Sequence, residues 1–245
     1  MNQGHRFSII IPTLQEGKLL FNTLRQFTAE IRHKFNIEII VSDGGSTDDT
    51  ISIAQSYANR VVQKEAGSKQ NISIGRNEGA KIATGEILIF INADVVIEDI
   101  NKFFLTLSDV FRDNTIIAAT CNVNIYPEEQ TIKDWIFHNC FNGYFWILNL
   151  IGIGMGRGEC HVVRREVFEK LNGYNNKLAA GEDFEFFMRL KKVGKVKFIR
   201  NLTVYESPRR FRRYGYFWIT LQWFLNSVSV LFFKHSFVDN WEPIR

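Results

Sequence analysis

The stretch EILIFINADVVIED (residues 86–99) combines an uninterrupted apolar run with a polar end. A run such as Ile87–Ile91 is typical of a strand that is covered on both faces. Asn92 and Asp94 come directly after the run. A turn could explain either residue alone. Whether the two residues belong to a functional site therefore depends on which residues follow the other strands.

The first half of the chain repeats the pattern, with helical periods between the apolar runs. The other strands are predicted at residues 7–11, 37–43 and 60–64, and the helices at 17–33, 48–58 and 69–84. This alternation predicts an α/β fold with a mostly parallel central sheet flanked by helices. The second half is less regular, with helices expected at 98–112, 130–150 and 182–194 and extended segments at 115–125, 159–163 and 195–199.

Composition limits the classes of protein that fit. A length of 245 residues suits one large α/β domain, or a core domain with an appendage. Cys121, Cys140 and Cys160 form no metal-ligand pattern, and an odd count suits a reducing compartment. The net charge of +4 is too mild to indicate a nucleic-acid partner. Four arginines within residues 209–213 are the only support for such a partner, and the neighbouring aromatics follow a helical period rather than alternating with the charges.

Polar side chains follow three of the predicted parallel strands. These ends carry Thr13 and Glu16, Asp43 and Ser46, and Asn92 and Asp94. Each residue alone could cap a helix or a turn. Ligands of open parallel sheets bind beyond the carboxyl ends of the strands, so the three ends together predict a ligand site. A dinucleotide site is disfavoured, because the first strand lacks a glycine-rich turn and GIGMGRG (152–158) follows a helical segment instead.

Four blocks of sequence, in order, resemble the inverting GT-A glycosyltransferases of family 2. They are SIIIPTLQE (8–16), IIVSDGGSTDDT (39–50), GRNEGAKIATGEILIFINAD (75–94) and GEDFEFFMRLKKVG (181–194). The ending VYESPRRFRRYG, followed by an apolar helix, is similar to that of small members of the family. The resemblance implies transfer of a sugar from a nucleotide-diphosphate donor, of the UDP or GDP type, to an acceptor.

The resemblance also implies roles for individual residues. Thr13, Glu16 and Asp43 match nucleoside contacts, with Ser46 beside them, and Arg76 matches a position near the diphosphate. Asp94 matches the last acid of a metal-binding DxD motif, which implies Mg²⁺ or Mn²⁺. Asn92 replaces the first acid of that motif, so a weakened metal site is expected and a metal-independent variant stays open.

Asp183, in the GED block, matches the catalytic base of the family. The alternative is structural, because acidic residues at a helix N-terminus are stabilised by the helix dipole. That setting would lower the pKa of Asp183 and make it a poorer base.

The C-terminal segment is predicted to lie on a membrane. We expect residues 1–207 to form the GT-A domain and 208–245 a basic, aromatic extension. As a helix, 214–233 is amphipathic, with Phe217 and Phe224 on its apolar face and Asn226 and Ser229 opposite. The expectation is a cytoplasmic protein, peripheral on the inner face of the cell membrane, whose arginines attract anionic lipid. Its acceptor would be a lipid or a lipid-linked glycan.

Three alternatives stay open. The helix at 214–233 could pack its apolar face on the sheet or on a second subunit. The enzyme could act away from membranes on a small hydrophilic acceptor. A non-catalytic nucleotide-binding or scaffold protein would explain the incomplete DxD motif.

Overall fold

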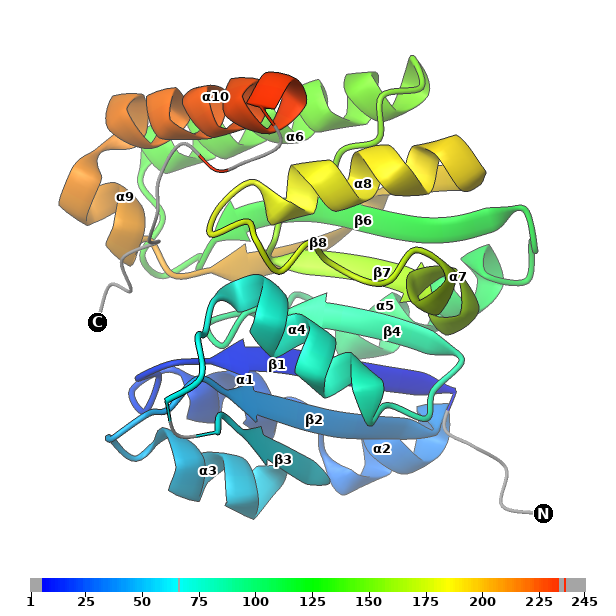
Figure 1. Cartoon of the computed structure of the whole chain (residues 1–245), viewed down its shortest axis with the longest axis vertical. Coiled ribbons are helices and arrows are strands. Elements are labelled where there is room, and N and C mark those ends of the chain that lie inside the picture. The colour runs from blue at the N-terminus through cyan, green and yellow to red at the C-terminus, as the bar shows by residue number, and fades with distance from the viewer. Residues whose placement is uncertain (1–5, 66, 234–235, 237–245) are drawn as a thin grey trace.

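The computed structural model describes residues 6–65, 67–233 and 236. Its strands form one eight-stranded sheet in the order β3-β2-β1-β4-β7-β6-β8-β5 (Figure 1). The strands are β1 (Phe7–Thr13), β2 (Ile37–Asp43), β3 (Arg60–Gln63), β4 (Ile87–Ile91), β5 (Val96–Ile97), β6 (Ile116–Ile125), β7 (Cys160–Arg164) and β8 (Lys195–Glu206). The helices are α1 (Leu20–Arg25), α2 (Ala29–Phe35), α3 (Thr50–Tyr57), α4 (Ile72–Lys81), α5 (Ile100–Val110), α6 (Ile132–Leu150), α7 (Arg165–Lys170), α8 (Glu182–Val193), α9 (Arg209–Tyr214) and α10 (Tyr216–Phe233).

The sheet is mixed but mostly parallel, which confirms the predicted fold class. The strands β3, β2, β1 and β4 run parallel to one another, and β6 and β8 form a second parallel pair. β7 lies between these two groups and is antiparallel to both β4 and β6. The carboxyl ends of β1, β2 and β4 therefore share one edge of the sheet.

Both faces of the sheet are covered, as the uniformly apolar strands predict. Ile9 and Ile11 of β1 belong to a core that α1, α2, α3 and α5 close on one face. Ile10 points to the opposite face, where side chains of α4, α7 and α8 complete a second core. Alternate residues of one strand thus supply two cores, because successive side chains of a strand point to opposite faces.

Local hydrogen bonds explain where two of the predicted helical segments differ from the structure. The segment 17–33 forms α1 and α2 rather than one helix, since Thr28 is extended and its hydroxyl accepts from the Ile31 N–H at 3.3 Å. The next helix begins at Thr50, and Asp48 rather than Ser46 or Thr47 accepts from the first-turn N–H of Thr50, at 3.1 Å. Local side-chain hydrogen bonds therefore set both helix starts.

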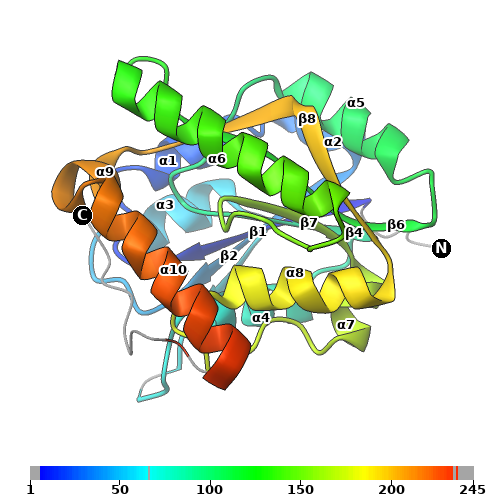
Figure 2. The same cartoon turned by 90° about the horizontal axis from the view of Figure 1, so that it is seen from above.

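Helices α6 and α10 lie together over the β6–β8 end of the sheet, with α9 leading into α10 (Figures 1 and 2). Ile125, Phe211 and Ile219 form a small core beneath them. In the described ranges, none of the helices has the length and hydropathy needed to span a bilayer. The predicted extension 208–245 is described as far as residue 233 and at Ser236, and its remaining residues lie outside the described part of the chain.

A buried carboxylate on β2 joins three strands at the opposite edge of the sheet. Glu38 is 1% exposed and accepts hydrogen bonds from the Ser8 hydroxyl at 2.5 Å and the Gly85 N–H at 3.2 Å. It also accepts from the Thr84 N–H and pairs with Arg60. Burial alone would raise the pKa of Glu38, but the hydrogen bonds from Ser8 and Thr84 and the Arg60 contact outweigh it and lower the pKa to about 2.

We expect the substitution Glu38→Gln to lower the free energy of unfolding at pH 7 by about 2–3 kcal/mol. A lowered folded-state pKa gives stability that is present above the unfolded value near 4.5 and is lost as the pH falls towards 2. The variant should therefore lose less stability than the native chain between these pH values. Urea unfolding from pH 3 to 7 measures this, with the exposed Glu86→Gln as control. Equal stability of the native chain and Glu38→Gln across this range would contradict the assignment.

Candidate active site

A cavity of about 1940 Å³ lies beyond the carboxyl ends of β1, β2 and β4. Small-molecule sites commonly occupy about 300–1,000 Å³, so this cavity has room for more than one ligand. Its walls come from the strand ends and from α6, α8, α9 and α10. Six of the eight residues predicted for the site line it, namely Thr13, Glu16, Arg76, Asn92, Asp94 and Asp183. The structure therefore gathers most of the predicted site in one place.

Asp43 and Ser46, the other two predicted residues, organise the turn after β2. The Oδ1 atom of Asp43 accepts from the N–H groups of Gly45 at 2.9 Å and Ser46 at 2.8 Å. Its Oδ2 atom accepts from the Thr13 hydroxyl at 3.0 Å and the Ser46 hydroxyl at 2.6 Å. These four bonds occupy the four lone-pair positions of a carboxylate. The predicted contact of Asp43 with a base stays a prediction, and its role in this structure is to hold β1 and the turn together.

Arg76 is fully buried and joins three segments of the site. Its Nη1 donates to Glu182 at 2.8 Å, and its Nη2 donates to the Asn92 side chain at 3.2 Å and to the Gly158 carbonyl at 2.8 Å. The guanidinium also lies over the Tyr174 ring, 5.2 Å from its centroid. The head group of Arg76 lies between β4 and α8 at the cavity wall, and its predicted place near the donor diphosphate stays a prediction.

Asp183 lies in the first turn of α8 and lines the cavity. Its Oδ1 accepts from the Phe184 N–H at 2.7 Å. Burial, and then the negative charge of Glu182, raises the pKa of Asp183 to about 7. The helix N-terminus was expected to lower this pKa, and burial outweighs it. No ion pair to Asp183 occurs among the described residues, whereas the neighbouring Glu182 pairs with Arg76.

Asp94 lies in a charged cluster with Glu16 and Arg209. Arg209 Nη1 and Nη2 donate to the two carboxylate oxygens of Glu16 at 2.9 and 2.7 Å. The same Nη2 lies 3.3 Å from Asp94 Oδ2. Burial raises the pKa of Asp94 to about 6, although the positive charge of Arg209 opposes the rise. Arg209 was among the arginines predicted to attract anionic lipid. In the structure it contacts Glu16 and Asp94, two of the acids predicted for the donor site.

Sequence reasoning missed a second group of charges in the cavity wall. Arg157 is buried, pairs with Glu206, and lies 3.3 Å from Glu159 through its Nε atom. Its Nη1 is also 3.0 Å from His138 Nδ1 on α6. Glu206 ends β8, so it occupies a strand end like the other site acids. The prediction ended this strand at residue 199, and its true length would have revealed Glu206.

The glycines of the 152–158 segment allow this segment to lie against α8. A Cβ atom on Gly154 would fall 2.3 Å from the Phe187 carbonyl oxygen, and one on Gly156 would fall 2.4 Å from the Phe187 ring. Both distances are below any van der Waals contact. The segment that superficially resembled a dinucleotide turn is therefore a close-packed spacer between α6 and β7.

The residues at the end of β4 do not fit a preformed site for a divalent metal. Mg²⁺ and Mn²⁺ take several oxygen ligands. The Asn92 side-chain oxygen is engaged by Arg76, and the Asp94 carboxylate faces Arg209. The described portion of the chain holds no group of three His, Cys, Asp or Glu side chains arranged for a metal ion. The predicted Mg²⁺ or Mn²⁺ therefore stays a prediction.

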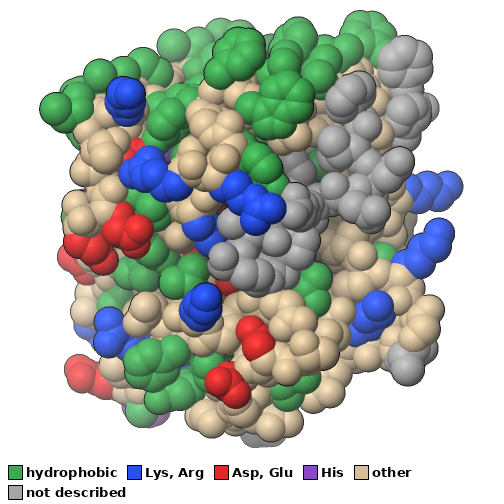
Figure 3. Space-filling model, turned by 90° about the vertical axis from the view of Figure 1, so that its left-hand side faces the viewer, with side chains coloured by type: hydrophobic (Ala, Val, Ile, Leu, Met, Phe, Trp, Pro, Cys, Tyr) green, Lys and Arg blue, Asp and Glu red, His purple; other side chains and the backbone are tan. Residues whose placement is uncertain are grey.

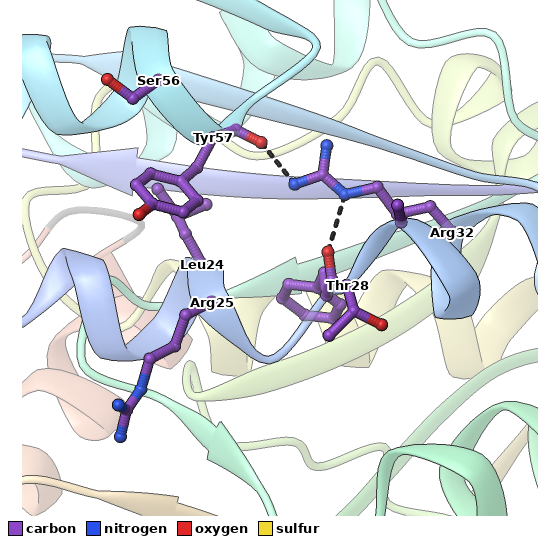
Figure 4. Close-up of a pocket in the computed structure, with 8 residues that line it drawn as sticks. Leu24, Arg25, Thr28, Arg32, Ser56 and Tyr57 are labelled. Atoms are coloured by element: carbon purple, nitrogen blue, oxygen red, sulfur yellow. Dashed lines mark hydrogen bonds between the residues drawn. The ribbon is translucent and has the colours of Figure 1, made fainter.

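A smaller cavity of about 310 Å³ lies between α1, α2 and α3 (Figure 4). Arg32 borders it, donates from Nε to the Phe27 carbonyl at 2.8 Å, and bonds the Tyr57 carbonyl. No carboxylate lines this cavity among the residues that the structure describes. Its polar contacts stabilise the helix packing and offer no catalytic acid or base.

Comparisons with known proteins agree with the geometry. The model of the family described as Glycosyl transferase family 2 matches residues 8–172. A PGL/p-HBAD biosynthesis glycosyltransferase of Mycobacterium tuberculosis is 25% identical over 190 residues, which cover 75% of this chain and 68% of that protein.

Two solved structures share the fold. The mannosyltransferase PcManGT from Pyrobaculum calidifontis, in complex with GDP-Man and Mn²⁺, matches with a TM-score of 0.63 and 20% identity. Staphylococcus aureus TarS, in complex with UDP-GlcNAc, matches with a TM-score of 0.62 and 17% identity. The matches cover 84% and 82% of this chain, and 58% of each of those chains. These likenesses confirm the predicted GT-A-like fold.

We expect Asp43→Asn to lower the free energy of unfolding by about 2–3 kcal/mol, because an amide nitrogen would face donors that now bind carboxylate oxygens. Urea unfolding measures the loss. Asp49→Asn is the control, since Asp49 lies in the same turn, is exposed and makes no side-chain cap hydrogen bond. Unchanged stability together with weaker nucleotide binding would show instead that Asp43 contacts the base.

Proposed function

The chain belongs to glycosyl transferase family 2 and is a nucleotide-sugar-dependent glycosyltransferase, and we propose that it inverts the anomeric carbon while transferring the sugar to a lipid or lipid-linked acceptor at a membrane surface. The observation that carries this proposal is a single cavity that reaches from the strand ends, past Asp183, to an apolar wall formed by α6 and α10. A donor and an amphipathic acceptor would meet in that cavity.

Asp183 is the proposed general base. The acceptor hydroxyl oxygen attacks the anomeric carbon, its proton passes to the Asp183 carboxylate, and the bond from that carbon to the diphosphate oxygen breaks. The electrons of that bond leave with the nucleoside diphosphate. A base works best when its pKa lies near the operating pH. The raised pKa of Asp183, about 7, therefore supports the role better than an ordinary aspartate would.

The donor is proposed to bind over the strand ends. Thr13, Glu16, Asn92 and Asp94 line that part of the cavity, and Arg76, Asp43 and Ser46 fix the backbone around it. PcManGT was solved with GDP-Man and TarS with UDP-GlcNAc, so UDP and GDP are both proposed as donor nucleotides. No step of the proposed mechanism passes through a metal.

Helices α6 and α10 support the membrane proposal because their apolar residues face outward. On α10, Phe217 is 80% exposed while Asn226 is 2% exposed. Asn226 and Ser229 therefore lie on the inward side with Ile219 and Val230, and a separate row of apolar side chains faces solvent. The apolar stripe of α10 continues through Phe224 and Leu231. This arrangement opposes the alternative in which the apolar face packs on the sheet.

Helix α6 is oriented in the same way. Its buried polar residues are Asp134, His138, Asn142 and Asn149, and its exposed apolar residues are Trp135, Ile136, Tyr144, Ile147 and Leu150. Figure 3 shows hydrophobic side chains gathered along the same end of the molecule, above several Lys and Arg side chains. An exposed apolar surface of this kind is typical of a membrane or protein contact. We propose that it lies in the cytoplasmic leaflet, with 208–245 as the membrane-facing extension.

The acceptor is proposed to lie between the two helices. Phe141, Phe145 and Leu148 of α6 face the cavity from one side, and Trp223 and Val228 of α10 from the other. A lipid chain would suit these walls, and its polar end would then approach Asp183. A small hydrophilic acceptor would leave this apolar wall unused, which disfavours the alternative of an enzyme acting away from membranes. A purely scaffolding role would give no reason for an Asp183 that has no ion pair among the described residues.

For the reaction, we expect the kcat of the native enzyme to rise with pH and to level off above an apparent pKa near 7, because only the ionised Asp183 accepts a proton. Asp183→Asn should lower kcat by about 10²–10⁴ on a hydroxyl acceptor. Turnover of a UDP- or GDP-sugar from pH 5.5 to 9 measures both effects. Glu185→Gln, in the same helix turn, is the control. Native-like turnover by Asp183→Asn would remove this residue from the mechanism.

For the membrane, we expect sedimentation with anionic liposomes to capture the native protein. The double variant Leu150→Ser and Phe217→Ser should reduce the binding constant about tenfold or more, since both exposed side chains would lose apolar burial. Leu105→Ser with Phe21→Ser, exposed on α5 and α1, is the matched control. Native protein that stays in the supernatant at low salt would favour the hydrophilic-acceptor alternative.

A further inference from the structure

Arg209 is the first residue of α9 and extends from the C-terminal segment into the donor side of the cavity. Both oxygens of Glu16 accept from its guanidinium, at 2.7 and 2.9 Å, and Asp94 lies 3.3 Å away. Residues 16, 94 and 209 are far apart in the sequence, so the fold brings this cation to the strand ends. Its side chain is 24% exposed, which leaves the guanidinium accessible from the cavity.

Another arginine of the same helix shows what a purely structural pair looks like here. Arg212 donates to both oxygens of Asp134, at 2.8 and 2.5 Å. Asp134 is fully buried, and neither residue lines the cavity. Arg209 and Arg212 therefore make equivalent two-point contacts with carboxylates, but only Arg209 does so on the wall of a ligand site.

The end of β4 lacks the second acid of a metal-binding pair and has an arginine beside its one acid. Asn92 is neutral where a second acid would strengthen cation binding, and Arg209 adds a positive charge beside the remaining Asp94. The Arg76 side chain is fully buried and pairs with Glu182, whereas the Arg209 side chain is 24% exposed at the cavity wall. Of these two arginines, Arg209 is the one placed to meet the diphosphate of a donor.

We propose that Arg209 is the diphosphate-binding cation of this enzyme. Its guanidinium donates to oxygens of the donor diphosphate, in the position where a metal would otherwise neutralise the leaving group, while Glu16 and Asp94 hold the guanidinium in place before the donor arrives. A planar guanidinium suits this task, because its paired N–H groups match phosphate oxygens in two-point contacts. The inference rests on the proposed binding of a UDP- or GDP-sugar over the strand ends and specifies how its diphosphate is bound.

The test compares Arg209→Gln with Arg212→Gln by calorimetric titration of UDP and GDP in EDTA. Whichever nucleotide binds the native protein should bind Arg209→Gln about 10- to 100-fold more weakly, the usual effect of losing a charge-assisted hydrogen bond. Arg212→Gln should change the dissociation constant less than about twofold, although its midpoint of thermal unfolding falls. Arg209→Lys, which keeps the charge without the fork geometry, should lie between the native protein and Arg209→Gln.

Manganese provides the second measurement. In Arg209→Gln, the carboxylates of Glu16 and Asp94 lose the guanidinium that contacts both of them, so Mn²⁺ should bind this variant more tightly than the native protein. Added Mn²⁺ should then restore part of the lost UDP or GDP affinity in this variant and change the native affinity little. UMP or GMP binding should be reduced less than binding of the diphosphate.

Three results would overturn this proposal alone, and a fourth would overturn the donor assignment with it. One is equal UDP or GDP affinity of the native protein and Arg209→Gln in EDTA, and another is tighter binding by the variant, which would mark Arg209 as a competitor of the donor. The third is an equal loss in Arg212→Gln, which would indicate a structural effect. Binding of neither nucleotide to the native protein, with or without Mn²⁺, would overturn the donor assignment and this proposal together. The Asp183→Asn variant tests the proposed base separately from the Arg209 proposal. It should lose turnover while its affinity for UDP or GDP stays unchanged.

Discussion

The buried guanidinium of Arg76 is the contact on which the geometry of the site depends. A charge removed from water is tolerated only when it is paired and hydrogen-bonded. Arg76 on α4 satisfies this requirement with Glu182 on α8 and Asn92 at the end of β4. The helix that carries Asp183 and the strand that leads to Asp94 are therefore held to each other through one side chain. As a result, the proposed base on α8 and the proposed diphosphate site after β4 are held at a fixed distance from each other.

The same requirement explains why the acids of the cavity differ in character. Glu16 and Asp94 lie at Arg209, Glu159 and Glu206 lie at Arg157, and Glu182 lies at Arg76. Asp183 makes no ion pair among the described residues, and burial and then Glu182 raise its pKa to about 7, although the Phe184 N–H and the charge of Arg76 oppose the rise. Carboxylates whose environments push their pKa values apart can take different roles in one site.

The sequence predicted the parallel half of the sheet well, because an uninterrupted apolar run has few explanations other than a buried strand. The same logic brought Thr13, Glu16, Asn92 and Asp94 to one edge. The pattern did not predict what each polar end does. Asp43 accepts three hydrogen bonds from its own turn and one from Thr13 on β1, and the Glu182 partner of Arg76 is 106 residues away. Nothing in the sequence distinguished the arginines at 209–213 from one another. In the structure, Arg209 lines the cavity and contacts Glu16 and Asp94, whereas Arg212 pairs with Asp134 away from the cavity. Periodicity likewise predicted the two faces of the 214–233 helix without showing which one turns inward.

The close packing of the 152–158 segment against α8 has a consequence for how this protein can evolve. Gly154 and Gly156 leave no room for even one methyl group against Phe187, four residues after Asp183. A larger residue there would move the whole helix, and a shift of about 1 Å in a reacting group can cost roughly 10²-fold in rate. Sugar and acceptor preference could therefore drift through changes in the helical walls of the cavity, while this spacer tolerates almost none. We therefore expect substitutions that change the sugar or the acceptor to be tolerated in the helical walls, and substitutions at Gly154 or Gly156 to disturb the position of the proposed base.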